Sequence, residues 1–267
     1  MNFHAGFRFP SLSSRFPLRL HVGRCFTPMS IESVATPRPR HADRAIYTAA
    51  ALVAVIVVFT GFARTYYLKR FFGAPELTGL VHLHGVVMTL WFLLFFVQVR
   101  LVASGRVELH RRLGLFGGLL AATIVGVGTV TAITGAKLGH TPGPPPLAFL
   151  TIPLGDMVVF SVLISLGLAY RSQAMMHKRL MLLASLSILT AAIARIPLDV
   201  VRQGGLPLYF GLEDLCILTC VIFDTAKNRR LHPALGWGFL FILASQGFRF
   251  WLAGTPQWLN FAAWLTG

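Results

Sequence analysis

The sequence is poor in charged residues, and poorest in acids. Only 12% of its 267 residues are Asp, Glu, Lys or Arg, and nine of these are acidic, whereas soluble chains carry about 25% charged residues. At the same time 55% of the residues are hydrophobic, and the mean hydropathy is +0.68. Three cysteines are too few for a disulfide framework. These numbers exclude a water-soluble domain, a disordered chain and a disulfide-stabilised scaffold.

The hydrophobic residues gather in long runs that lack the alternation of a membrane β-barrel. A bilayer core about 30 Å thick needs about 20 apolar residues per helix, and the sequence holds seven runs of roughly that length. We expect spans at residues 45–63, 80–99, 113–136, 147–170, 180–196, 208–223 and 234–253. The prediction is therefore an all-α integral membrane protein, a seven-transmembrane helix bundle.

The net charge of +15 comes from 24 Lys and Arg that are unevenly distributed. Seventeen of them precede the first span or lie in the loops after the second, fourth and sixth spans, and seven lie on the other side. By the positive-inside rule the N-terminus is cytoplasmic and the C-terminus extracytoplasmic. The charge therefore indicates orientation in a bacterial inner membrane, with the lipid bilayer as partner, and no nucleic-acid binding.

The first 40 residues differ from the rest of the chain. They are basic, and the part before Met29 is rich in Arg, Ser and Phe without an acid. No apolar run of a signal peptide precedes residue 45. Residues 1–28 resemble a transit peptide in composition, or translated upstream sequence with Met29 as the start. We expect a disordered basic extension at 1–40 and a transmembrane domain at 41–267.

A histidine stands at the predicted cytoplasmic entry of each outward-going helix. The words HADRA, HRRLG, HKRLM and HPALG begin at His41, His110, His177 and His232. One hypothesis is that His110, His177 and His232 converge to hold a metal, or that two of them hold heme axially. The alternative is that these side chains contact lipid headgroups.

A second set of ionisable residues lies towards the predicted outer surface. Its members are His82, His84, Asp156, Arg195, Glu213, Asp214 and Arg249. Ionisable residues inside a membrane are costly and are functional candidates by default. Asp156 is the strongest candidate, because a short carboxylate cannot reach the surface as lysine can.

The three acids of this outer set would pair with Arg195 and Arg249. Such pairing predicts either an ion-pair layer that fixes helix packing or a functional site. The functional site would be a proton path, a metal site formed by His84 with a carboxylate, or a polar pocket for a headgroup or quinone.

Two cysteines offer a further candidate metal site. Cys216 and Cys220 are four residues apart on one predicted helix, a spacing that suits copper, for which methionine is a further soft ligand. The alternative is that both are small buried apolar residues. The complete set of candidate metal ligands is His84, Asp156, Cys216 and Cys220.

Two passages carry a resemblance to known families. They are VHLHGVVMTLWFLLFFVQVRLVASGRVELHRRLG at 81–114 and HKRLMLLASLSILTAAIARIP at 177–197. From His41 to Trp264 the chain resembles a group of uncharacterised bacterial multi-pass membrane proteins. The His-centred words are also similar to those of small membrane proteins that include assembly factors for heme–copper oxidases. That similarity implies work around heme b, copper or respiratory-chain proteins, without assigning a ligand.

Four hypotheses about function follow, and they leave open whether the chain is an enzyme. The first is a redox-linked protein, either heme-binding or an oxidase-assembly factor. The second is a proton-coupled transporter or channel that uses Asp156, Arg195 and the Glu213/Asp214 pair. The third is a metal-dependent membrane enzyme, and the fourth is a structural subunit whose charges only pack helices.

Overall fold

The computed structural model describes residues 41–267 apart from 142 and 144, with side chains from Arg44 onward. The extension predicted at 1–40 lies outside the described residues. Within them every regular element is a helix, as predicted. The helices are α1 (His41–Phe62), η1 (Ala63–Tyr67), η2 (Lys69–Phe71), α2 (Gly79–Ala103), α3 (Val107–Lys137), α4 (Pro146–Phe149), α5 (Thr151–Ala169), α6 (Ala174–Leu186), α7 (Thr190–Ile193), α8 (Asp199–Asn228), α9 (Pro233–Ala253) and α10 (Pro256–Thr266).

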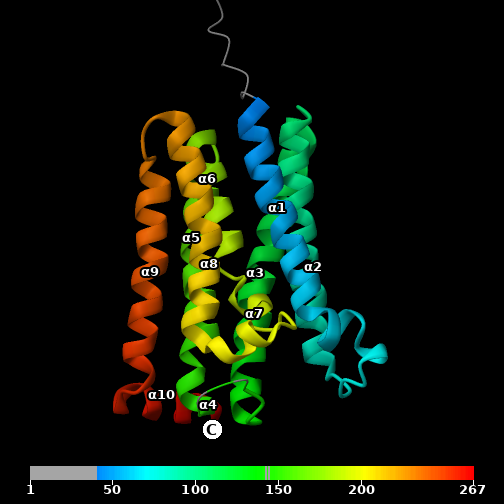
Figure 1. The fold of residues 1–267 in the computed structure, drawn as a ribbon, viewed down its shortest axis with the longest axis vertical. Coiled ribbons are helices and arrows are strands. Elements are labelled where there is room, and N and C mark those ends of the chain that lie inside the picture. Colours follow the sequence, from blue (N-terminus) through cyan, green and yellow to red (C-terminus); the bar gives the residue numbers. More distant parts are fainter. Residues whose placement is uncertain (1–40, 142, 144) are drawn as a thin grey trace, which may run out of the picture. The chain divides into compact units, whose positions relative to one another are not determined.

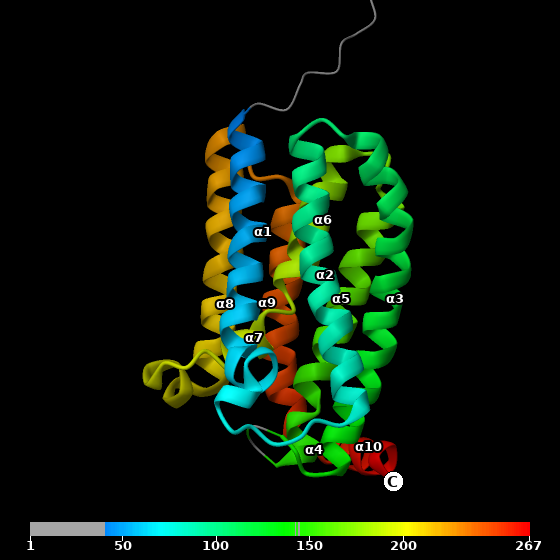
Figure 2. The same cartoon turned by 90° about the vertical axis from the view of Figure 1, so that its right-hand side faces the viewer.

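The long helices stand side by side (Figure 1), and they remain upright in the view turned by 90° (Figure 2). The start of α1 and the α2–α3, α5–α6 and α8–α9 connections lie together, and we call this the basic end. Short α4 and α10 lie at the opposite end, which we call the far end. Successive long helices therefore alternate in direction, as short connections between packed helices require.

Six helical segments are long and apolar enough to cross a membrane. They are Arg44–Tyr67, Gly79–Ala103, Val107–Lys137, Pro146–Ala169, Ala174–Ile193 and Asp199–Asn228. These cover six of the seven predicted spans. The seventh prediction coincides with α9, which has 21 residues but carries Gln246 and Arg249, and it is not among the six.

The outer faces of the helices carry large apolar side chains. Leu115 and Leu119 on α3 are 83% and 68% exposed, and Trp237 on α9 is 72% exposed. Soluble monomers rarely expose large contiguous apolar surfaces. Such faces fit a lipid environment.

The interior is packed closely by aromatic side chains and glycine. The Trp91 ring on α2 meets Phe160 on α5 edge-on, with 5.1 Å between ring centroids. Gly128 on α3 faces Met157, whose sulfur would lie 2.6 Å from any Cβ at that position. A small residue here lets α3 and α5 approach, which favours association of membrane helices.

The fifth predicted span, 180–196, is not one continuous helix. Helix α6 ends at Leu186, residues 187–189 are not helical, and α7 adds a single turn that ends at Ile193. Every residue from 182 to 190 is buried. Irregular backbone at membrane depth is tolerated only where protein or a cavity surrounds it. The interruption therefore has a protected position inside the bundle.

Helix α8 is longer than the predicted sixth span, 208–223, and it bends near its start. Gly205 has φ +61° and ψ −165°, and Pro207 follows two residues later. Glycine adopts that backbone conformation without a Cβ penalty, and proline lacks the N–H that would continue the helical hydrogen bonds. The bend separates a short first segment of α8 from its long second segment.

Candidate functional site

One face of α8 carries two buried acids. Glu213 and Asp224 are 1% and 3% exposed. They are eleven residues apart, which is three helical turns and about 16 Å along the axis. Ile217, Cys220 and Val221 are the buried residues between them. Two polar clusters therefore lie on one helix, separated by an apolar layer.

The first cluster, which we call the far-end cluster, contains a buried ion pair. Arg249 on α9 places Nη1 2.5 Å from Oδ1 of Asp156 on α5, and both residues are buried. The same Nη1 donates to the Ile152 carbonyl at 3.3 Å, and Nε donates to the Ser245 hydroxyl at 3.2 Å. The guanidinium lies 5.3 Å from the centre of the Phe210 ring. One of the pairings predicted from sequence, Asp156 with Arg249, is present.

Glu213 belongs to the same cluster, but no described Lys or Arg forms an ion pair with it. Its Oε2 accepts a hydrogen bond from the Thr190 hydroxyl, and its buried Oε1 has no hydrogen-bond partner among the described residues. Glu213 interacts electrostatically with both members of the Asp156–Arg249 pair. A buried carboxyl group with an unused oxygen is costly and is a candidate for proton binding.

The interrupted helix supplies the only described hydrogen bond to Glu213. Thr190 is the first residue of α7, directly after the break at 187–189. On the other side of this segment, α1 approaches so closely that a Cβ on Gly61 would lie 2.1 Å from the Ala192 carbonyl oxygen. Thr190 is therefore held in a short segment that packs backbone to backbone against α1.

The other acid of the sequence-predicted pair, Asp214, faces a different neighbour. Its Oδ1 accepts a hydrogen bond from Gln246 Nε2 at 3.0 Å, and its side chain is half-buried. Because α8 turns by about 100° per residue, Asp214 and Glu213 point to different sides of the helix.

Arg195 makes no described ion pair with an acid. Its Nη1 donates to the Ala191 carbonyl at 2.8 Å, and its guanidinium lies 5.0 Å from the centre of the Phe62 ring. Half-buried His84 interacts electrostatically with Arg195. His82 is exposed, and its carbonyl accepts a hydrogen bond from the Tyr66 hydroxyl. Neither histidine has a described contact with the Asp156–Arg249 pair.

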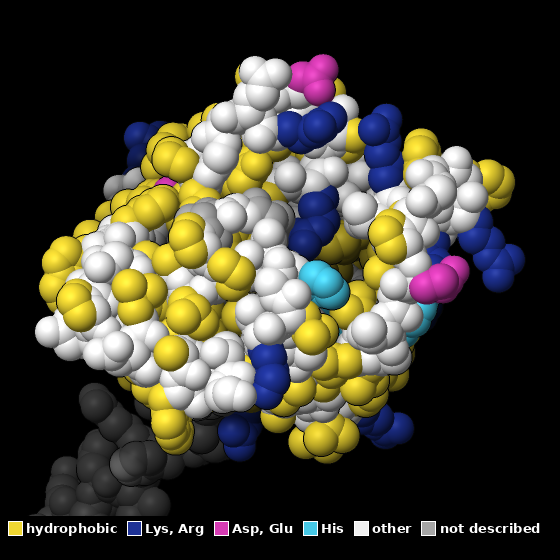
Figure 3. Space-filling view, turned by 90° about the horizontal axis from the view of Figure 1, so that it is seen from below, with side chains coloured by type: hydrophobic (Ala, Val, Ile, Leu, Met, Phe, Trp, Pro, Cys, Tyr) yellow, Lys and Arg dark blue, Asp and Glu magenta, His cyan; other side chains and the backbone are white. Residues whose placement is uncertain are grey.

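A cavity with mainly apolar walls lies next to the far-end cluster. Its volume is about 220 Å³, and it is bordered by Thr151, Ile152 and Arg249. Seen from this end, the surface is hollowed near its middle, with Lys or Arg and His side chains at the rim (Figure 3). The cavity lies beside Arg249 of the far-end cluster, and no described histidine lines it, in contrast to the hollow seen in Figure 3.

The second cluster, which we call the basic-end cluster, is fully paired. Arg179 is 0% exposed and contacts both oxygens of Asp224 through Nε and Nη2, at 2.7 to 3.0 Å. Its Nη1 donates to the Met175 carbonyl at 2.8 Å, and Tyr47 donates to Asp224 at 3.4 Å. Sequence reasoning missed this cluster because it counted Arg179 among the loop charges. The one available signal was an acid, Asp224, at the end of a predicted span.

Two of the three predicted cofactor-binding histidines lie close together. The rings of His110 and His177 are 6.1 Å apart between centroids, and His177 Nδ1 lies 2.7 Å from the Gly167 carbonyl oxygen. The Nδ1 of half-buried His110 has no hydrogen-bond partner among the described residues. Neither residue borders the two cavities described for the bundle.

His232 has a different role. Its Nδ1 accepts a hydrogen bond from the Ala234 backbone N–H at 3.2 Å and caps α9. Partial burial, together with the nearby Arg179 cation, lowers the pKa of His232, and the Asp224 carboxylate acts in the opposite direction. The neutral imidazole that the cap requires is thereby favoured.

The described residues contain no group of three or more His, Cys, Asp or Glu that could hold a metal ion. Cys216 and Cys220 are free thiols on α8, and Cys220 is buried. Asp156 is occupied by Arg249, whereas His84 lies with Arg195. The predicted metal set is not brought together, and heme or metal binding gains no support.

Comparison with protein-family models, with curated proteins and with solved structures finds no match to this chain. The resemblance to bacterial multi-pass proteins and to oxidase-assembly factors therefore stays a prediction.

Proposed function

We propose that this chain is a proton-translocating membrane protein, a proton-coupled transporter or channel in which Glu213 binds the proton. The observation that carries the proposal is the state of this side chain: it is 1% exposed, forms no ion pair with a described Lys or Arg and leaves Oε1 unpartnered among the described residues. Burying an unpaired carboxylate costs far more than burying a neutral acid. Glu213 is therefore suited to take up a proton at Oε1 and to release it when its surroundings change.

The Asp156–Arg249 pair supports the same site from the far end. Its Arg249 borders a cavity of about 220 Å³, and both members of the pair interact electrostatically with Glu213. A positive guanidinium near Glu213 favours the anion, and a negative carboxylate favours the neutral acid. A change in the Asp156–Arg249 contact would then alter how readily Glu213 holds its proton.

The interrupted α6–α7 segment supplies an element that can move. Transporters commonly place their sites at broken helices near the membrane midplane, and Thr190 joins this break to Glu213. Towards the basic end the apolar layer of Ile217, Cys220 and Val221 follows Glu213 on the buried face of α8. Proton passage to that side therefore requires a change in helix packing, as alternating access does.

The proposal includes the membrane arrangement. We infer that α9 forms a seventh span, since it runs beside α5, α6 and α8 along the bundle (Figure 1) and buries its Gln246 and Arg249. The basic end would face the cytoplasm of a bacterial cell by the positive-inside rule, with the C-terminus outside the inner membrane.

Proton flux into liposomes tests the function. The full chain is reconstituted with a pH-sensitive dye inside, and a potassium diffusion potential, negative inside, is imposed. The assay is run in buffer alone and with a filtrate of small cytoplasmic metabolites, so that a solute-coupled flux is also measured. We expect proton uptake by the wild-type chain and a loss of about tenfold or more in Glu213→Gln.

Asp214→Asn is the matched control. It removes a neighbouring carboxylate whose described partner is Gln246, on a different side of α8, and uptake should persist. The proposal is wrong if wild-type liposomes show no uptake under either condition, or if Glu213→Gln transports protons as the wild type does.

The redox-linked hypothesis has one observation in its favour, the approach of His110 to His177 at 6.1 Å. A pair of imidazoles is the usual axial ligand set of b-type heme. A Soret band in the purified protein that disappears in His177→Ala, together with unchanged proton flux in Glu213→Gln, would favour it over proton translocation.

A further inference from the structure

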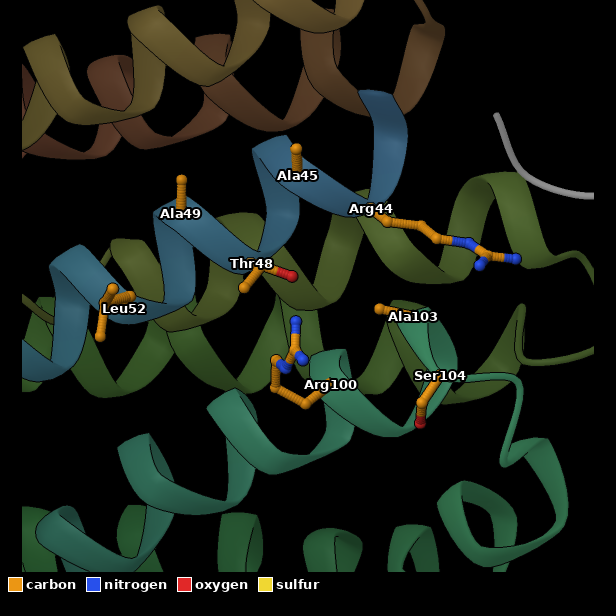
Figure 4. A pocket seen from close by; sticks show the side chains of 8 residues that line it. All are labelled: Arg44, Ala45, Thr48, Ala49, Leu52, Arg100, Ala103 and Ser104. Atoms are coloured by element: carbon orange, nitrogen blue, oxygen red, sulfur yellow. The ribbon is translucent and has the colours of Figure 1, made fainter. Parts of the chain in front are cut away.

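A groove between α1 and α2 lies at the basic end, on the opposite end of the bundle from the far-end cluster. Its volume is about 480 Å³. Arg44 and Thr48 come from the first turns of α1, Arg100 comes from the last turn of α2, and Ser104 directly follows α2 (Figure 4). Because the two helices are antiparallel, the start of α1 lies beside the end of α2; Arg100 points toward Thr48, and Arg44 extends toward the helix ends (Figure 4).

The groove is cationic and lacks a counterion among the described residues. Both arginines border it, and neither has an ion-pair partner there, although Arg112, Arg179 and Arg249 each contact an acid. Buried polar groups normally find hydrogen-bond partners. Arg44 Nε and the Thr48 hydroxyl are both buried and have no hydrogen-bond partner among the described residues. These donors are suited to an anionic oxygen ligand.

The groove becomes apolar along α1. Ala45, Ala49 and Ala103 contribute only methyl groups to its walls, and Leu52 borders its other end with 46% of its surface exposed. Leu52 is eight residues beyond Arg44, about 12 Å along the helix axis. The cationic part of the groove therefore lies at the helix ends, and the apolar part lies further along α1, towards the middle of the bundle.

We propose that this groove binds an anionic phospholipid of the leaflet at the basic end. Arg44 and Arg100 bind the phosphate, since arginine donates in a fixed fork that matches phosphate oxygens. The Thr48 hydroxyl donates to the headgroup, and an acyl chain lies along Ala49 and Leu52. Basic pockets between transmembrane helices on the cytoplasmic side are the usual form of such sites.

Charge also argues against the chain's own N-terminal segment as the occupant. Residues 1–40 contain six Arg and one acid, Glu32. A basic segment does not complement a groove with two unpaired arginines. This inference does not depend on proton translocation by Glu213.

Native mass spectrometry of the full chain in detergent tests the proposal. Dioleoylphosphatidylglycerol, dioleoylphosphatidylcholine and inorganic phosphate are titrated separately. We expect the anionic lipid to bind at least about tenfold more tightly to the wild type than to Arg44→Gln/Arg100→Gln, since charge-assisted hydrogen bonds to phosphate are lost. The matched control, Arg111→Gln/Arg230→Gln, removes the same charge from exposed positions of the same end outside the groove, and its affinity should stay at the wild-type value.

A second variant tests the apolar part of the groove without changing charge. Ala49→Trp fills the groove at an exposed position of α1 and should also weaken binding of phosphatidylglycerol. Equal binding by the wild type and the Arg44→Gln/Arg100→Gln variant would overturn the proposal. So would phosphatidylcholine binding as tightly as phosphatidylglycerol, or millimolar phosphate displacing the lipid, because the last result would identify a site for free phosphate.

Discussion

The basic-end and far-end clusters are both built from a buried arginine and buried acids, but they differ in how completely their polar atoms are paired. In the basic-end cluster, Arg179 and Asp224 share three N–O contacts and use both carboxylate oxygens. In the far-end cluster, one N–O contact joins Arg249 to Asp156, and Glu213 keeps an oxygen without a described partner. Each cluster includes one buried acid of α8, Glu213 or Asp224, and these two positions are about 16 Å apart along the helix axis.

The comparison separates a structural cluster from a functional candidate. A saturated buried pair has one low-energy arrangement, because moving either group would leave an unpaired charge. The far-end cluster has more than one arrangement available, because it contains an unpaired acid, borders a cavity and contacts a broken helix. The paired cluster would then hold α6 and α8 together while the other changes its protonation state.

The largest expected effect is on the paired cluster. Asp224→Asn leaves the Arg179 cation buried without its counterion, and we expect a loss of about 3–5 kcal/mol in stability. Thermal unfolding in detergent, followed by helical circular dichroism, measures this loss. The double variant Arg179→Met/Asp224→Leu, which has no buried charge at this position, should recover most of it. A single variant that unfolds as the wild type does would remove the basis of the comparison.

A smaller loss is expected for the far-end pair. Asp156→Asn removes one charge-assisted hydrogen bond, while Arg249 keeps its bonds to the Ile152 carbonyl and the Ser245 hydroxyl. We expect a cost of about 2 kcal/mol in the same unfolding measurement. If Asp156→Asn costs as much as Asp224→Asn, the two clusters do not differ in the way their contacts indicate.

The smallest expected effect is on the pH dependence of stability near the basic-end cluster. The pKa of His232, next to the basic-end cluster, is lowered by burial and by Arg179. Its contribution to stability is therefore complete above the unfolded-state pKa of about 6.5 and is lost as the pH falls through the lower folded-state pKa. Thermal midpoints of the wild type should fall slightly more between pH 7.5 and 5.5 than those of His232→Asn, which keeps a capping side chain but does not titrate. Identical pH profiles would show that the His232 cap is independent of the charged cluster.

Hydropathy located the helices well, because a long apolar run can adopt few structures other than a buried or membrane-spanning helix. Six predicted spans coincide with helices that could cross a membrane, and the seventh coincides with α9. The break at 187–189 was not predicted, because its residues are as apolar as their neighbours and no proline or glycine marks it. Buried protein contacts surround this segment, including the close approach of Gly61 to Ala192.

The site was predicted in part. The sequence identifies ionisable residues whose burial is energetically costly, but it does not identify their partners. Asp156 and Arg249 were singled out and do form a pair. Arg195 was expected to pair with an acid and instead lies over the Phe62 ring. Arg179 was treated as a loop charge because it lies close to a predicted membrane edge, where a long side chain usually reaches water. Only the three-dimensional arrangement shows it turned inward to Asp224.

The position of α1 has a consequence for how the chain is assembled. Gly61 fits against Ala192, and Tyr47 donates to Asp224, so α1 packs against segments made more than a hundred residues later. Chains are synthesised from the N-terminus, and membrane helices insert before they associate. If the bundle assembles in a bilayer, we expect this face of α1 to be filled only after α7 and α8 have been made, so that its docking is a late step in biogenesis.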